Sequence, residues 1–224
     1  MIVLALDTAT AATVVGVARD GDLLAERRHD PAPGERPGHV RELLGLCAAA
    51  LGDAGLAFGD VDRVAAGVGP GTFTGLRIGV ATARALAQAT GAEVAAVSTL
   101  AAVAAGAAGH GGPVLACLDA RRGELFCATW RADGTPLAAP CAVRPEGLSD
   151  LLTRAPGPWL ACGDGAVRSR DRLAAAGADV PPDGDRRHAV AAGALCRLAA
   201  QAPAIGRDAL VPEYVRPPDA TPRA

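Results

Sequence analysis

The 224-residue chain contains no lysine and no asparagine, so every basic residue apart from its four histidines is an arginine. The absence of lysine excludes any mechanism that needs this residue. One example is the phosphate-binding loop G-x-x-x-x-G-K, whose lysine reaches the nucleotide phosphates. Alanine, glycine, proline and arginine are abundant instead, a composition typical of a GC-rich genome.

Aromatic residues are scarce, with three phenylalanines, two tryptophans and one tyrosine in the chain. Half of the residues are apolar, so the core must be built from alanine, valine and leucine. No uncharged apolar run approaches the roughly 18 residues of a membrane-spanning helix. The apolar run 2–6 meets Asp7 at once and has no basic region before it, so we expect a first strand and not a signal peptide.

Charge and cysteine give no sign of a nucleic-acid or metal site. The formal net charge is −2, and pairs such as Arg121-Arg122 and Arg186-Arg187 are interpreted as solvated charge. The six cysteines form no C-x-x-C motif, and we expect reduced thiols in a cytoplasmic protein. The four histidines have no ligand spacing, so no metal site is predicted.

No catalytic motif is found either. The sequence has no G-x-S-x-G, and its cysteines have no local catalytic pattern. Four acids could hold magnesium or act as a base, and each is explained equally well as a turn or cap residue: Asp7, Asp119, Glu124 and Asp164. We therefore assign no catalytic, cofactor-binding or metal-binding residue.

The most unusual stretch is the glycine-rich segment 67–77, between an apolar strand candidate and a long helix candidate. Four glycines and one proline within residues 67–75 indicate a shaped loop, because glycine reaches positive φ and proline fixes φ. The loop lacks the G-x-G-x-x-G register of dinucleotide-binding proteins. Either its amides bind an anion at the helix N-terminus, or its bare surface receives a partner.

Small residues continue from this loop along a helix expected at 76–89. They recur every four residues and share one helix face: Gly75, Gly79, Ala83 and Ala87. Such a smooth stripe permits the close approach of another backbone. That backbone is either the chain's own sheet or a partner helix, and the spacing leaves both interpretations open.

Hydrophobic periodicity and turn residues divide the chain into strands and helices. In the first half, strands are expected at 2–6, 13–18, 23–28, 60–66 and 93–97, and helices at 39–51, at 76–89 and from the N-cap Ser98 through Ala108. In the second half, helices are expected at 145–154, 166–176 and 190–200, and strands at 159–162 and 210–216.

The two halves begin alike. Residues 3–7 (V-L-A-L-D) are echoed by 114–119 (V-L-A-C-L-D), and 15–21 by 127–134, at nearly the same offset. Each half thus has a strand, an acidic turn, a second strand and a D-G turn, which predicts a duplicated lobe.

Two α/β lobes that each begin with a β-meander are the architecture of the actin, sugar-kinase and Hsp70 superfamily. In that fold, Asp7 and Asp119 would face the phosphates of ATP. We expect a first lobe at 1–109, a second, degenerate lobe at 110–216 and a flexible tail at 217–224.

Five segments, in chain order, resemble the TsaB family, also called YeaZ. Residues 69–79 read G-P-G-T-F-T-G-L-R-I-G, a long and specific signature. Supporting matches are 4–10, 97–100, 119–126 and 212–216, although Ala96 stands where the family has glycine before V-S-T-L. The residues assigned to the family-motif loop are Gly69, Pro70, Gly71, Thr72, Phe73, Thr74 and Arg77.

The resemblance implies a non-catalytic relative of TsaD that serves as a scaffold subunit in bacterial synthesis of threonylcarbamoyladenosine, next to the tRNA anticodon. In that machinery TsaD is the transferase and TsaE the ATPase. ATP is therefore used by the complex, and no cofactor is expected on the isolated chain. The implied partners are a TsaD homologue, a TsaE homologue, tRNA only through the complex, and a second copy when TsaD is absent, with no membrane.

Carried onto this chain, the resemblance places the TsaD interface on the two helices 39–51 and 76–89. The residues assigned to it are His39, Val40, Leu43, Cys47, Gly75, Leu76, Gly79, Val80, Ala83 and Ala87. Two alternatives stay open. A small-molecule kinase of the same superfamily would bind Mg-ATP tightly, and a glycoprotease-like metallopeptidase would hold zinc or iron.

Overall fold

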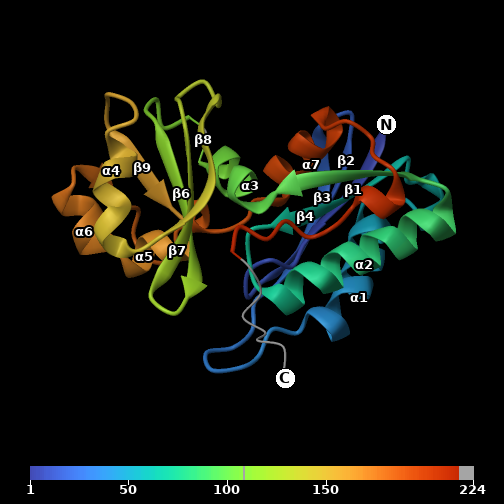
Figure 1. Ribbon diagram of the computed structural model, residues 1–224. Coiled ribbons are helices and arrows are strands. Elements are labelled where there is room, and N and C mark those ends of the chain that lie inside the picture. The colour runs from blue at the N-terminus through green and yellow to red at the C-terminus, as the bar shows by residue number, and fades with distance from the viewer. Residues whose placement is uncertain (108, 217–224) are drawn as a thin grey trace.

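The computed structural model describes residues 1–107 and 109–216, which form two α/β lobes lying side by side (Figure 1). Each lobe is built on one five-stranded sheet. The predicted tail at 217–224 and the predicted helix end at Ala108 lie outside the described residues.

The first sheet has the strand order β3-β2-β1-β4-β5. Its strands are β1 (Ile2–Asp7), β2 (Thr13–Arg19), β3 (Asp22–His29), β4 (Arg63–Gly69) and β5 (Glu93–Ser98). The turn at Asp20-Gly21 joins β2 to β3 as an antiparallel hairpin, whereas β1 and β4 pair in parallel and need a crossover. The helices α1 (His39–Asp53), α2 (Phe73–Thr90) and α3 (Thr99–Gly106) follow β3, β4 and β5.

The second sheet has the order β10-β9-β6-β7-β8. Its strands are β6 (Val114–Arg121), β7 (Glu124–Trp130), β8 (Pro136–Val143), β9 (Trp159–Cys162) and β10 (Ala178–Asp179). The helices of this half are α4 (Leu148–Leu152), α5 (Asp164–Arg168), α6 (Arg170–Ala175) and α7 (Ala192–Gln201). β6 pairs antiparallel with β7 and parallel with β9, as β1 does with β2 and β4, which confirms the predicted duplication.

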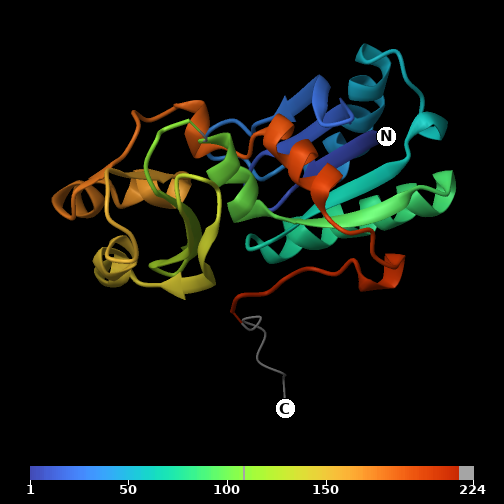
Figure 2. The same ribbon diagram turned by 90° about the horizontal axis from the view of Figure 1, so that it is seen from above.

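A core shared by both halves lies between the two sheets, where α3 and α7 pack against each other (Figure 2). Val3 of β1, Leu118 of β6 and Leu195 of α7 are buried there. α1 and α2 cover the other face of the first sheet, and α4 to α6 cover the outer face of the second. Leucine, valine and alanine dominate these cores, as the composition predicts.

The chain returns to the first lobe after the second sheet. α7 packs against β1 and β2, and Ile205 forms a bridge with Val94 of β5. The expected second lobe at 110–216 therefore does not describe the arrangement in space, where the second sheet ends with β10. The predicted strand at 210–216 is wrong, because Pro212 has no N–H to donate and no strand is assigned to the segment. The backbone contact of the segment with β4 is the hydrogen bond from the amide of Glu213 to the carbonyl oxygen of Val68.

Several predicted boundaries also differ. The expected helix at 145–154 is a 3₁₀ turn, Pro145–Gly147, followed by α4. The expected helix at 166–176 is divided at Ser169, whose φ of −109° and ψ of 17° interrupt the helix. β4 extends to Gly69 because Gly67 and Gly69 continue the pairing with Val97 and Ser98 of β5.

Candidate functional site

The glycine-rich loop between β4 and α2 packs on the turn that follows β1. A Cβ atom on Gly71 would lie 2.4 Å from the carbonyl oxygen of Ala9, and one on Gly75 would lie 2.0 Å from that of Thr8. Only glycine fits at these positions, because the β1 turn occupies the space of a side chain.

Hydrogen bonds join the same two segments. The amide of Thr72 donates to the carbonyl oxygen of Ala9 at 2.8 Å, and the hydroxyl of Thr8 donates to that of Gly75 at 2.7 Å. The Thr72 amide, at the start of α2, is thus directed at the protein's own backbone. The sequence suggested that the loop binds either an anion or a partner protein. In the structure the loop instead packs on the turn after β1.

Asp7 ends β1 beneath this loop and is almost completely buried. Its carboxylate accepts hydrogen bonds from the amide of Ala9 at 2.8 Å and from the hydroxyl of Thr99 at 2.7 Å. Burial raises the pKa of Asp7 to about 6, and these hydrogen bonds oppose part of the shift. A Cβ on Gly67 would lie 1.8 Å from Oδ2 of Asp7, so this glycine gives the carboxylate its space.

The acids of the second lobe are engaged by neighbouring groups. Asp119 accepts a hydrogen bond from Arg168 at 2.6 Å, and Glu124 pairs with Arg216. Asp164 accepts one from the amide of Asp119 at 3.0 Å, and burial raises its pKa. Across residues 1–107 and 109–216, no group of three or more His, Cys, Asp or Glu could hold a metal ion.

A cavity of about 630 Å³ lies between the lobes, bounded by β3, the β1–β2 turn and residues 184–192. Arg28 and Arg187 line it, and they pair with Asp30 at 2.6 Å and Asp185 at 2.8 Å. Each of these two arginines is therefore neutralised by a neighbouring aspartate of the same chain.

The cysteines are free thiols. Burial raises the pKa of Cys47, Cys162 and Cys196 to about 12. Because the thiolate is the reactive form, these three behave as small apolar groups near neutral pH.

The small-residue stripe faces the protein's own sheet, because α2 packs on β4. The buried residues of the predicted interface are Gly75, Leu76, Gly79, Val80, Ala83 and Ala87 on α2 and His39, Leu43 and Cys47 on α1. The prediction that they form an exposed docking face is wrong, since side chains inside the fold cannot meet a partner. Of the predicted set, Val40 alone is exposed, at 81%.

The outer surface of α1 and α2 carries different residues. Both helices begin at the end of the first sheet where β1 and β4 finish. α2 follows β4 closely, and His39 at the start of α1 forms a hydrogen bond with Thr13 at the start of β2, at 2.8 Å. Near these starts, Val40 and Leu44 of α1 and Phe73 and Arg77 of α2 are exposed. Together with Tyr214 we name these residues the helix-pair surface.

Tyr214 joins this surface from the C-terminal segment. Its ring stacks on Phe73 with the centroids 5.5 Å apart, and its hydroxyl accepts a hydrogen bond from Nε of Arg77 at 3.0 Å. The Arg77 guanidinium lies 3.7 Å from the centroid of the Phe73 ring, in cation–π contact. Sequence reasoning missed Tyr214 as a site residue, although the P-E-Y-V-R match at 212–216 was a signal.

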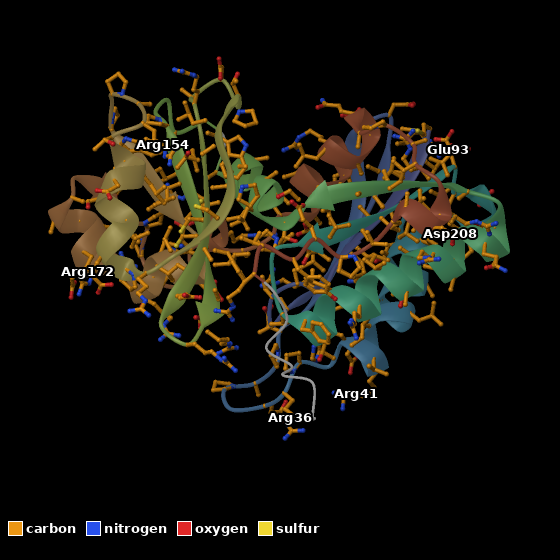
Figure 3. All side chains as sticks on the ribbon, in the orientation of Figure 1. Arg36, Arg41, Glu93, Arg154, Arg172 and Asp208 are labelled. Carbon is orange, nitrogen blue, oxygen red and sulfur yellow. The ribbon has the colours of Figure 1, made fainter. Side chains whose placement is uncertain are left out.

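Arginine also lies at this end of the molecule. Arg36, in the loop before α1, and Arg41 of α1 both point into solvent away from the two lobes (Figure 3). Arg41 forms an ion pair with Glu42 at 2.6 Å.

Among the described residues, no helix is long and apolar enough to span a bilayer.

Comparison with known proteins places the chain in a family. The family model described as TsaD, tRNA N6-adenosine threonylcarbamoyltransferase, matches residues 35–161. An uncharacterized protein of Mycobacterium leprae is 42% identical over 151 residues, which cover 66% of this chain and 40% of that protein. The tRNA threonylcarbamoyladenosine biosynthesis protein TsaB of Escherichia coli is 33% identical over 171 residues, 74% of this chain and 72% of that protein.

Solved structures agree with this assignment. YeaZ from Pseudomonas aeruginosa superposes with a TM-score of 0.76 at 26% identity, over 95% of this chain and 99% of that one. Two further structures, at 13% and 10% identity with TM-scores of 0.54 and 0.52, share the fold alone. The fold is the duplicated actin-like, sugar-kinase and Hsp70 architecture, as predicted. The G-P-G-T-F-T-G-L-R-I-G loop, the family match and these relatives together show that the chain belongs to the TsaB (YeaZ) family, within the wider TsaD family.

Proposed function

We propose that this chain is a non-catalytic subunit in tRNA threonylcarbamoyladenosine biosynthesis and that it binds a TsaD homologue. The observation that carries the proposal is the helix-pair surface, a set of exposed apolar and aromatic side chains on a member of the TsaB family. It lies at the starts of α1 and α2, the helices on which the family resemblance places the partner.

The chemistry of this surface favours a protein partner. Phenylalanine, tyrosine and arginine are the residue types that concentrate binding energy at protein interfaces. Val40 and Leu44 are exposed by 81% and 55%, and full burial of such a side chain contributes about 1.5–3 kcal/mol. Covering these two residues together with the Phe73–Arg77–Tyr214 cluster therefore contributes to the affinity of such a complex.

The proposed lack of catalysis rests on how the polar groups are used. The glycine loop and the β1 turn fill each other's space, and Asp7 is bonded within the fold. Asp119 and Glu124 are paired with arginines. We therefore assign the use of ATP to the complex, with a TsaE homologue as its ATPase, and not to the isolated chain.

Further partners follow from the same proposal. tRNA reaches the complex without direct binding to this chain, whose net charge is −2. A second copy covers the helix-pair surface when the TsaD homologue is absent, because an exposed apolar patch favours association. The proposed location is the cytoplasm.

Co-purification with the TsaD homologue of the same genome tests the proposal. The wild-type chain is expected to bind. A variant with Val40→Asp and Leu44→Asp loses at least about tenfold in affinity, since each lost apolar contact is worth more than roughly 1 kcal/mol. The matched control is Leu24→Asp on β3, where the leucine is 40% exposed and lies outside the surface.

The outcomes separate two claims. If the wild-type chain does not bind the TsaD homologue, the subunit proposal fails. If the double variant binds as tightly as the Leu24→Asp control, the partner docks elsewhere. The kinase alternative predicts tight Mg-ATP binding by the isolated chain, which calorimetry measures directly.

A further inference from the structure

The last described residues form a segment that contacts both lobes. Residues 210–216, here named the C-terminal strap, run from the first lobe toward the second (Figures 1 and 2). Leu210 is fully buried in the core under α1 and α2, and Val215 packs against the core between the sheets. The strap is therefore held in the fold near both of its ends.

On the first lobe, the strap lies against the end of β4 and the start of α2. The amide of Glu213 donates to the carbonyl oxygen of Val68 at 2.8 Å, and a Cβ on Gly69 would lie 2.8 Å from the carbonyl oxygen of Glu213. Tyr214 then supplies its ring and hydroxyl to Phe73 and Arg77. The strap thus contributes Tyr214 to the helix-pair surface.

On the second lobe, the strap reaches the turn between β6 and β7. Arg216 pairs with Glu124 of β7 and donates to the carbonyl oxygen of Ala120 of β6 at 3.3 Å. Between these contacts, Arg121 and Arg122 have φ angles of 64° and 53°. Left-handed backbone costs roughly 1–2 kcal/mol at a residue with a side chain, so this turn depends on its surroundings for its shape.

We propose that the C-terminal strap couples the helix-pair surface to the β6–β7 turn, so that a protein bound at the surface restrains the turn on the other lobe. Only Val215 separates Tyr214 from Arg216. A displacement of the strap that accompanies covering of the Tyr214 ring must therefore reach the Arg216 contacts. The strap acts as a mechanical link between a docking site and a strained turn.

Hydrogen–deuterium exchange on the full-length chain tests the link without a partner. Tyr214→Ala is expected to speed exchange of the β6–β7 turn amides by about fivefold, the factor that corresponds to loss of one hydrogen bond of roughly 1 kcal/mol. Val40→Ala, on the same surface but outside the strap, leaves the turn unchanged. If Tyr214→Ala speeds exchange only at the start of α2, the coupling is refuted.

A second arm rests on the proposed function and uses the TsaD homologue. Its binding slows exchange at the β6–β7 turn of the wild-type chain. Arg216→Gln still binds but loses that slowing, because the link to Glu124 is cut. Equal slowing in both chains means that the partner touches the turn directly, which overturns the coupling. Failure of the wild-type chain to bind counts against the proposed function alone, and the partner-free comparison then decides the coupling.

Discussion

Alanine substitutions at three helical glycines distinguish internal packing from docking. A Cβ on Gly79 of α2 would stand 2.4 Å from Oγ1 of Thr8, whose hydroxyl donates to the carbonyl oxygen of Gly75 at 2.7 Å. To admit the methyl group, Thr8 must rotate and lose this buried hydrogen bond, which costs roughly 1–3 kcal/mol. The better helix propensity of alanine offsets about 1 kcal/mol. Gly79→Ala is therefore expected to lower the free energy of unfolding by about 1 kcal/mol.

Gly75→Ala is expected to destabilise more. Its Cβ would lie 2.0 Å from the carbonyl oxygen of Thr8, a backbone atom that cannot rotate away. Relief of this overlap requires α2 to move, and overpacking of this kind costs about 1–3 kcal/mol or more. Gly45 on the exposed face of α1 is the matched control, since nothing lies within 4 Å of its Cβ position. Gly45→Ala stabilises by about 0.5–1 kcal/mol.

Urea unfolding followed by circular dichroism measures all four chains. The expected order of stability is Gly45→Ala, wild type, Gly79→Ala, Gly75→Ala. The reasoning is refuted if the two α2 variants are as stable as Gly45→Ala. If Gly79→Ala keeps its stability but loses the TsaD homologue, the stripe is a docking face after all.

Two further predictions concern buried polar residues. Because the pKa of Asp7 is raised to about 6, its protonated form favours the folded state, and this contribution is lost as the pH rises from about 4 to about 6. Asp7→Asn is therefore expected to gain stability relative to wild type over that interval, by up to roughly 3 kcal/mol, in paired urea unfolding at each pH. A constant difference would contradict this. Arg63 donates to the carbonyl oxygens of Ala199 at 2.9 Å and Ala202 at 2.8 Å, so Arg63→Met is expected to destabilise by about 2–4 kcal/mol in thermal unfolding. Glu93→Gln, which weakens the ion pair with Arg63 but keeps these bonds, is expected to change stability by less than about 1 kcal/mol. Equal losses in the two variants would refute the stabilising role of the hydrogen bonds from Arg63 to the two carbonyl oxygens.

Local patterns were enough to predict most of the sheet framework. The Asp20-Gly21 turn predicted the β2–β3 hairpin, and the repeated start at Val114 predicted a second sheet paired like the first. Short-range signals suffice here because a hairpin and its turn are close in sequence. The helix breaks at Ser169 and after Pro145 were missed, since alanine and leucine around them keep the helical pattern.

The candidate site depends on contacts between distant residues, which no local pattern reports. The spacing of Gly75 and Gly79 predicted a smooth face on α2, and that face exists. What covers it is the β1 turn, and Thr8 is 67 residues from Gly75. Tyr214 is 137 residues from Arg77 in the sequence. Its position on the helix-pair surface therefore could not be predicted from sequence and required the structure.

The packing of the glycine loop on the β1 turn has a consequence for association. Because the Thr72 amide and the Thr8 hydroxyl are bound to the opposite segment, the start of α2 is rigid in the free protein. A rigid surface loses little conformational entropy when it is covered, so more of its contact energy appears as affinity. We therefore expect α2 itself to move little when a partner covers it, so that any displacement on binding is confined to the C-terminal strap.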